Sequence, residues 1–110
     1  MKVFLGADHA GYRLKEEIKN FLQKKRIDFE DLGTNSEQSC DYPDYAKKVA
    51  KKVQKNKNGL GVLACGTGTG TAITANKFKG IRAVQATSTY LAKMAREHNN
   101  ANVLSLGARI

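Results

Sequence analysis

The sequence predicts an α/β fold in which one parallel β-sheet is covered by helices on both faces. Short apolar runs of strand length alternate with amphipathic segments of helix length along all 110 residues, which is the pattern of consecutive βαβ units. Turns rich in glycine, asparagine and aspartate separate these segments, and no internal repeat or low-complexity linker interrupts them. Because parallel strands are joined by crossovers, the helices must lie against the faces of the sheet.

The first half of the chain supplies two strands and two helices to this fold. Leu14, Ile18 and Phe21 recur at helical spacing, which predicts an amphipathic helix. The only proline, Pro43, falls in the first turn of the next helix, with Asp41 as the expected N-cap. The predicted elements are, in order, a strand at residues 2–6, a helix at 11–25, a weaker strand at 27–32, a loop at 33–43 and a helix from there to about residue 55.

The second half repeats the alternation around a glycine-rich turn. Its predicted elements are a strand at residues 60–65, the turn at 66–70, a helix that begins over 71–77, a strand at 81–86, a helix at 88–98 and a strand at 103–106. The chain is thus expected to form a five-stranded parallel sheet with right-handed crossovers.

Composition excludes several classes of protein. Apolar residues make up 41% of the chain, which is ordinary for a folded domain and too many for a disordered one. No apolar run approaches the ~18 residues of a membrane span, and the apolar stretch at the N-terminus is too short for a signal peptide. Cys40 and Cys65 stand far apart, so we expect free thiols in a cytoplasmic protein.

The charge of the chain indicates an anionic partner. The net charge is +9, and from Tyr45 onward twelve bases accompany a single acid, which fits either nucleic acid or a phosphorylated small molecule. The lysines between residues 47 and 57 alternate with apolar residues at helical spacing, which favours a solvated helix face. No aromatic residues or known reading motif accompany them, so we expect no nucleic-acid partner.

Polar residues cluster where predicted strands end, which is where ligands bind in parallel α/β sheets. Asp8 and His9 follow the first strand, and Cys65 and the glycine-rich turn follow the third. We also place His98 and Asn99, which end the last helix, at this edge.

The glycine-rich turn is suited to binding an anion. Glycines at every second position let backbone N–H groups converge on one spot, and the helix that follows adds the positive end of its dipole. The spacing is neither the dinucleotide fingerprint nor a Walker loop, and a purely structural turn is also compatible with it. Cys65, directly before the turn, is either a reactive thiolate or a buried apolar side chain.

Together these groups fit proton transfer next to a carbonyl. A base moves a proton between adjacent carbons while backbone N–H groups stabilise the enediolate. The two histidines, His9 and His98, neighbour polar residues, which favours an acid–base or anion-binding role over a structural one.

Six motifs in order make a family resemblance specific. They are GADHAG at residues 6–11, DYPDYA at 41–46, CGTGTG at 65–70, ANK at 75–77, GIRA at 80–83 and AREHNNANVL at 95–104. Over essentially its whole length the chain resembles the ribose-5-phosphate isomerase B family, which also includes the galactose-6-phosphate isomerase subunits. The resemblance implies a Rossmann-like α/β/α sandwich, no metal and no other cofactor, and interconversion of ribose 5-phosphate and ribulose 5-phosphate in the pentose phosphate pathway.

The resemblance also implies roles for individual residues. Cys65 matches the family's base; an acidic base of a second branch would stand at Thr71. His98 matches the proton donor that helps to open the sugar ring. The substrate-binding positions it implies are Asp8, His9 (near the phosphate), Tyr42, the loop Gly66, Thr67, Gly68, Thr69 and Gly70, then Asn99 and the phosphate-binding Arg109.

By the same resemblance, the chain is expected to work as a homodimer or a dimer of dimers with sites shared between subunits. Residues 1–110 are expected to form a single sugar-phosphate isomerase domain without the helical segment that usually follows in the family. Two other functions stay open: isomerisation of a hexose 6-phosphate, such as galactose or allose 6-phosphate, and phosphosugar binding without catalysis.

Overall fold

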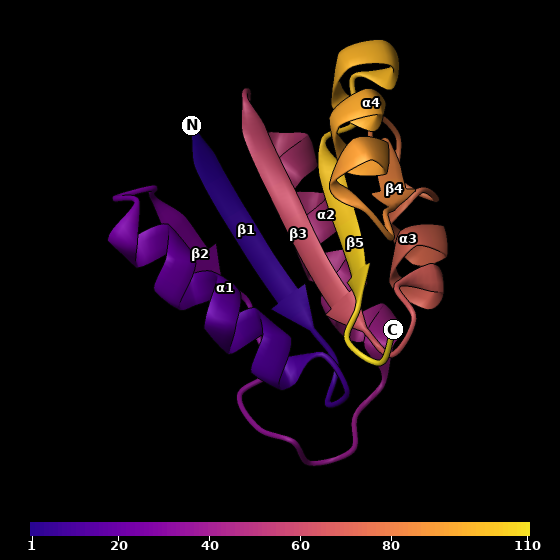
Figure 1. Cartoon of the computed structure of the whole chain (residues 1–110). Helices are drawn as coiled ribbons and strands as arrows, with labels where there is room; N and C mark the ends of the chain where they lie inside the picture. Colours follow the sequence, from indigo (N-terminus) through magenta and orange to yellow (C-terminus); the bar gives the residue numbers. More distant parts are fainter.

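The computed structural model describes residues 1–110 and contains five strands that alternate with four helices. They are β1 (Lys2–Ala7), α1 (Tyr12–Lys24), β2 (Phe29–Asp31), α2 (Tyr42–Lys55), β3 (Gly59–Cys65), α3 (Thr69–Ala75), β4 (Ala83–Gln85), α4 (Thr89–Asn99) and β5 (Val103–Gly107). All strand pairs are parallel, in the order β2-β1-β3-β5-β4 (Figure 1). The predicted α/β sandwich with a five-stranded parallel sheet is therefore confirmed.

Differences from the predicted boundaries are small and have local causes. The edge strands β2 and β4 have three residues each, because each pairs with one neighbour only and ends where that pairing ends. Helix α3 begins at Thr69 rather than residue 71, directly after Gly68 in a left-handed conformation (φ 83°). Asp41 precedes α2 as expected, although its side chain makes no capping hydrogen bond.

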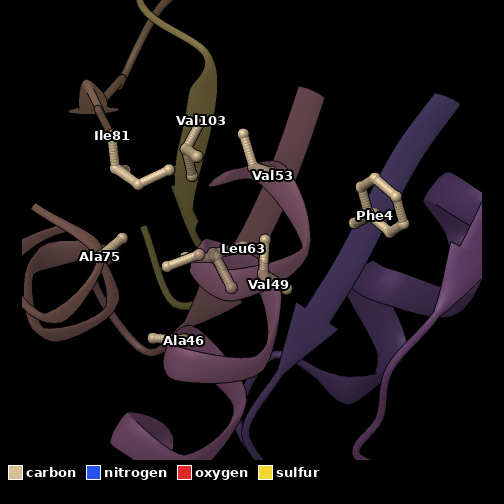
Figure 2. Close-up of a cluster of buried hydrophobic side chains, with 9 residues drawn as sticks. Phe4, Ala46, Val49, Val53, Leu63, Ala75, Ile81 and Val103 are labelled. Carbon is tan, nitrogen blue, oxygen red and sulfur yellow. The ribbon is translucent and has the colours of Figure 1, made fainter. Parts of the chain in front are cut away.

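Helices α2 and α3 cover one face of the sheet and form the larger core with it (Figure 2). Gly6 and Gly61 let α2 lie unusually close to β1 and β3. A methyl group at either position would be 2.7 Å from a methyl carbon of Val49, whereas carbon atoms in contact are ordinarily about 3.5–4 Å apart. The core cluster consists of Phe4, Ala46, Val49, Ala50, Val53, Leu63, Ala75, Ile81 and Val103.

The opposite face is only partly covered. Helix α1 packs there on a smaller cluster around Val3, Leu5 and Leu22. Helix α4 lies on the same face, near β4 and β5 (Figure 1). Between the two helices are a cavity of about 200 Å³ lined by Val62, Ala92 and Leu104 among others, and one of about 450 Å³ whose lining includes Leu14, Leu106 and Ile110. None of the helices combines the length and apolar character that a membrane crossing requires.

A buried lysine ties α1 to the end of β2. Lys15 is 2% exposed, and its Nζ lies 2.7 Å from Oδ2 of Asp31 and 2.7 Å from Oε2 of Glu16. Lys19 also approaches Oδ2 of Asp31, at 2.8 Å. Burial opposes ionisation of Asp31, but hydrogen bonds from the two lysines and the Gly33 amide outweigh it, so the pKa of this carboxyl is lowered.

We expect Asp31→Asn to destabilise the fold at neutral pH by roughly 2–3 kcal/mol, somewhat less than removal of a sole partner from a buried ion pair, because Glu16 still faces Lys15. A carboxylate with a lowered folded-state pKa stabilises the fold above its unfolded pKa, and this contribution disappears as the pH falls through the folded value. The stability gap between variant and wild type, measured by urea unfolding, should therefore narrow below about pH 4.

Glu30→Gln is the matched control for this prediction. Glu30 meets Lys52 at 3.7 Å, with both side chains well exposed, so its loss should cost less than about 1 kcal/mol. A gap for Asp31→Asn that stays constant from neutral pH to pH 3 would contradict the assignment of the stabilising charge to Asp31.

Candidate active site

Most of the candidate site residues lie at the carboxyl ends of β1 and β3. These strands are neighbours, with Ala7 paired to Ala64, and β1 lies between β2 and β3, so the chain leaves in opposite directions on either side. Such a switch point is where ligands bind in open α/β sheets. Asp8 and His9 follow β1 here, Cys65 is the last residue of β3, and the glycine-rich turn comes directly after it, at the strand ends that the sequence predicted.

Asp8 and His9 are both held by the backbone. The Gly11 amide donates to Oδ1 of the buried Asp8 at 3.0 Å. Nδ1 of His9 lies 3.2 Å from both the amide nitrogen and the carbonyl oxygen of Cys40, so the ring accepts from the amide in one tautomer and donates to the carbonyl in the other. Cys40, which the sequence left without a role, thus orients His9 through its main chain.

The thiol of Cys65 is buried at the start of the glycine-rich turn. The Gly68 amide donates to Sγ at 3.2 Å, and Oγ1 of Thr71 lies 3.3 Å from Sγ. The sulfur therefore faces the first turn of α3, as expected. A thiol that receives an amide hydrogen bond in this position has a partner ready for its anionic form.

The glycine-rich turn is fixed from two sides. Nε2 of Gln85 donates to the carbonyl of Thr67 at 2.9 Å and to Oγ1 of Thr69 at 2.7 Å. The ring of Tyr42 lies directly on Gly70, where a methyl group would be 2.5 Å from Cε1. Tyr42 thus borders the turn, and its implied contact with substrate stays a prediction. Gln85 is a supporting residue that no sequence motif indicated.

Arg109 lies at the same edge in the same chain. Its amide donates to the carbonyl of Gly66 at 2.9 Å, and the Ala108 amide donates to the carbonyl of Cys65 at 2.8 Å. The guanidinium lies beside the turn, with Nη1 3.4 Å from where a methyl group on Gly66 would be. A planar, permanently charged group beside this turn is suited to a phosphate.

His98 and Asn99 lie at the amino ends of the strands, so the expectation that they lie at the same end of the sheet as Cys65 is wrong. Helix α4 runs antiparallel to the strands and ends where β5 begins (Figure 1). Asn99 lines a cavity of about 370 Å³ together with Arg82 at the start of β4. The physical reason is topological: a helix that precedes a parallel strand ends at that strand's amino end. The seven residues of β3, at about 3.3 Å each, put roughly 20 Å between the two edges.

Two buried hydroxyl groups complete the surroundings of Cys65. Oγ1 of Thr71 and Oγ of Ser105 are 2.6 Å apart, and Ser105 donates to the carbonyl of Gly68 at 2.7 Å. Both side chains are fully buried. The signal that could have indicated Ser105 is a lone hydroxyl in the apolar strand VLSLG, since buried polar groups in such strands need a partner.

The comparisons with known proteins agree with this architecture. The family model described as Ribose/Galactose Isomerase matches residues 3–110. Ribose-5-phosphate isomerase B of Escherichia coli is 45% identical over 99% of this chain and 73% of the relative. The solved structure of the Clostridium thermocellum enzyme of that name matches with a TM-score of 0.97 and 49% identity, over 100% of this chain and 74% of that one.

A solved Mycoplasma genitalium ribose-5-phosphate isomerase B, described with bound ribulose-5-phosphate, is 45% identical with a TM-score of 0.94, over 98% of this chain and 72% of that one. A family-model match over nearly the whole chain, together with relatives of such identity, fixes the relationship. The chain therefore belongs to the ribose/galactose isomerase family.

Proposed function

We propose that the protein interconverts ribose 5-phosphate and ribulose 5-phosphate, with Cys65 as the base. The observation that carries the proposal is the sulfur of Cys65 at the switch point of the sheet, 3.2 Å from the Gly68 amide and beside the glycine-rich turn. Relatives named ribose-5-phosphate isomerase B, one of them described with bound ribulose-5-phosphate, support the choice of substrate.

The proton transfer between C2 and C1 of the sugar needs one side chain of the protein, that of Cys65. The thiolate of Cys65 removes the proton from C2 of the open-chain aldose. The C–H electron pair forms the C1–C2 double bond, and the carbonyl electrons move to O1. The resulting thiol returns the proton to C1, where the electron pair of the C1–C2 double bond forms the new C–H bond. The proton of O2 passes to O1, and the electron pair it leaves forms the carbonyl at C2, which yields the ketose and regenerates the thiolate. One base is enough, because C1 and C2 are adjacent.

The turn at residues 66–70 supplies the electrostatic part of this mechanism. Negative charge develops on O1 and O2, and amide N–H groups fixed before the reaction stabilise it without reorganisation. Gln85 and Tyr42 keep the turn in place from outside. We assign the phosphate of the substrate to His9 and Arg109, which provide a ring nitrogen and a guanidinium.

We further propose that two copies of the chain build each site. His98 and Asn99 are about 20 Å from Cys65 in one chain, so a site that contains all three residues needs a second copy. The apolar face between α1 and α4, with Leu14, Val62 and Leu104, is open to such a partner. Exposed Tyr90 and Leu91 on α4 extend the same apolar character.

An isomerase assay with three phosphosugars tests the proposed function. Ribose 5-phosphate should be converted to ribulose 5-phosphate, whereas galactose 6-phosphate and allose 6-phosphate should react at least about tenfold more slowly in kcat/KM, which corresponds to one lost favourable contact of about 1.4 kcal/mol. Faster turnover of a hexose 6-phosphate would reassign the substrate. Binding of all three sugars without turnover would leave a phosphosugar-binding protein.

Arg109→Lys should raise KM for ribose 5-phosphate roughly tenfold. Lysine keeps the charge but lacks the planar two-pronged donor, and a charge-assisted hydrogen bond contributes about 1.5 kcal/mol. Steady-state kinetics at fixed ionic strength measure the change.

The control for Arg109→Lys is a triple variant, Lys48→Gln, Lys51→Gln and Lys55→Gln, on the solvated face of α2. These residues are exposed and lie on another part of the molecule, so KM should stay within about threefold because of solvent screening. The reverse pattern, with Arg109 dispensable and the lysines essential, would place the phosphate elsewhere.

A further inference from the structure

The hydroxyl groups of Thr71 and Ser105 form a closed chain from the sulfur of Cys65 to the carbonyl of Gly68. The steps are 3.3 Å from Sγ to Oγ1 of Thr71, 2.6 Å from there to Oγ of Ser105, and 2.7 Å from Ser105 to the Gly68 carbonyl. The same glycine also donates its amide to Sγ. All of these contacts are buried, and the one between Thr71 and Ser105 joins residues 34 positions apart in the sequence.

The hydroxyl of Thr71 can donate to either of two neighbouring acceptors. The carbonyl of Gly68 accepts from Ser105 at 2.7 Å, whereas Thr71 is 3.4 Å from it. Ser105 therefore satisfies the carbonyl, and the hydroxyl of Thr71 is not required there. Oγ1 of Thr71 lies between Sγ and Oγ of Ser105, so its single proton can go to either atom.

The two protonation states of Cys65 select different orientations of that hydroxyl. In the thiol state, S–H donates to Thr71, Thr71 donates to Ser105, and Ser105 donates to Gly68, so every donor has an acceptor. In the thiolate state, Sγ has no proton to give, so the Thr71 hydroxyl turns to donate to it beside the Gly68 amide, and the Ser105 hydroxyl turns to donate to Thr71. Rotation of these two hydroxyls converts one state into the other, and the Gly68 carbonyl keeps the Ala72 amide as a donor, at 3.3 Å.

We propose that Thr71, anchored by Ser105, is a positioning residue that gives the Cys65 sulfur a matched hydrogen-bond partner in both of its protonation states. Thr71 touches only the sulfur and groups of its own chain. It holds Sγ in one place while the proton leaves for the substrate and returns. The inference rests on the proposed function, because it assumes that Cys65 alternates between thiolate and thiol during turnover.

The experiment follows the ionisation of Cys65 directly. In a Cys40→Ser background Cys65 is the only thiol. The ultraviolet absorbance against pH, taken as the difference from a Cys40→Ser, Cys65→Ala protein that carries the same four tyrosines, reports this thiolate alone. The variants are Thr71→Val, Thr71→Ser and Ser105→Ala. Thr74→Val is the matched control, since Thr74 lies on the same helix α3 and has no part in the hydroxyl chain. Asp8, His9 and Arg109, the charged and titratable residues placed at these strand ends, stay unchanged in all variants.

Thr71→Val should move the midpoint of the thiolate titration upward by about one pH unit, because a donor to the anion is lost. Thr71→Ser should restore most of the shift, and Ser105→Ala should give a smaller shift in the same direction. In the isomerase assay, Thr71→Val should lower kcat about tenfold with KM unchanged, since no substrate contact is removed. Thr74→Val should match the background in both measurements.

Two results would overturn the proposal. One is a Thr71→Val protein that is folded by circular dichroism and titrates like the background. The other is a Thr71→Ser protein that behaves like Thr71→Val, which would assign the effect to packing. Absence of isomerase activity in the background protein would refute the proposed function instead, and the titration would still test the role of Thr71.

Discussion

Cys65→Ala abolishes isomerisation, with kcat/KM expected to fall by about a thousandfold or more, within the range that a general base contributes. The alanine has no group that can take the proton from C2, while the turn and the phosphate contacts remain. Because the Gly68 amide loses its acceptor, we expect a stability loss of about 1–2 kcal/mol and a retained fold. Initial rates with ribose 5-phosphate and urea unfolding measure the two effects separately.

Two further variants sharpen this prediction. Cys65→Ser keeps an acceptor for the Gly68 amide and a partner for Thr71, so it should be as stable as wild type and still inactive, because an alcohol is a far weaker acid than a thiol. Cys40→Ala removes only a side chain and leaves the main-chain contact to His9, so it should be fully active. Turnover by Cys65→Ala near the wild-type rate would end the assignment of Cys65 as the base.

Mixing two inactive variants should restore activity. Cys65→Ala lacks the base and His98→Asn lacks the ring-opening donor, so neither homodimer has an intact site. In a mixed dimer, one site takes Cys65 from one copy and His98 from the other. Random association of equal amounts should give about a quarter of the wild-type activity, since half of the dimers are mixed and one of their two sites is intact.

Co-expression of the two chains with different affinity tags, followed by purification of the mixed species, isolates the active form. This form should have about half of the wild-type activity, because one of its two sites is intact. A mixture of Cys65→Ala with a Cys65→Ala, His98→Asn double variant is the control, and it should stay inactive because no copy carries the base. No recovery in the purified mixed dimer would mean that Cys65 and His98 do not meet across an interface.

The strand and helix pattern of this fold was predictable because each element carries its own period. Leu14, Ile18 and Phe21 indicated α1 without any tertiary information, and the apolar run before Cys65 indicated β3. The glycine-rich turn and the residues after β1 were placed correctly at the carboxyl edge, since strand ends follow directly from strand positions. Arg109 came from the resemblance alone, and the structure places it beside Gly66.

Features that depend on contacts between distant residues were not predictable from these periods. The Thr71–Ser105 contact joins α3 to the sheet across 34 positions. The lone hydroxyl of Ser105 in an apolar strand indicates that it needs a partner, but nothing in the sequence identifies Thr71 as that partner. Lys15 reads as a solvated helix residue in the sequence, yet Asp31 from the edge strand covers it. The misplacement of His98 is of another kind, because its position just before the last strand of a parallel sheet already implies the amino end of that strand.

The close packing of α2 on two glycines of the sheet couples the core to the position of Tyr42 beside the glycine-rich turn. Gly6 and Gly61 both contact Val49 in the middle of the helix. Tyr42 lies seven residues before Val49, about 10 Å along the helix axis, so a tilt of α2 at this contact moves the tyrosine ring. A side chain at either glycine would lift the helix and carry the tyrosine ring away from Gly70. The position of Tyr42 beside the glycine-rich turn therefore depends in part on two glycines in the interior, and a substitution there can move this ring while the polar groups at the strand ends stay the same.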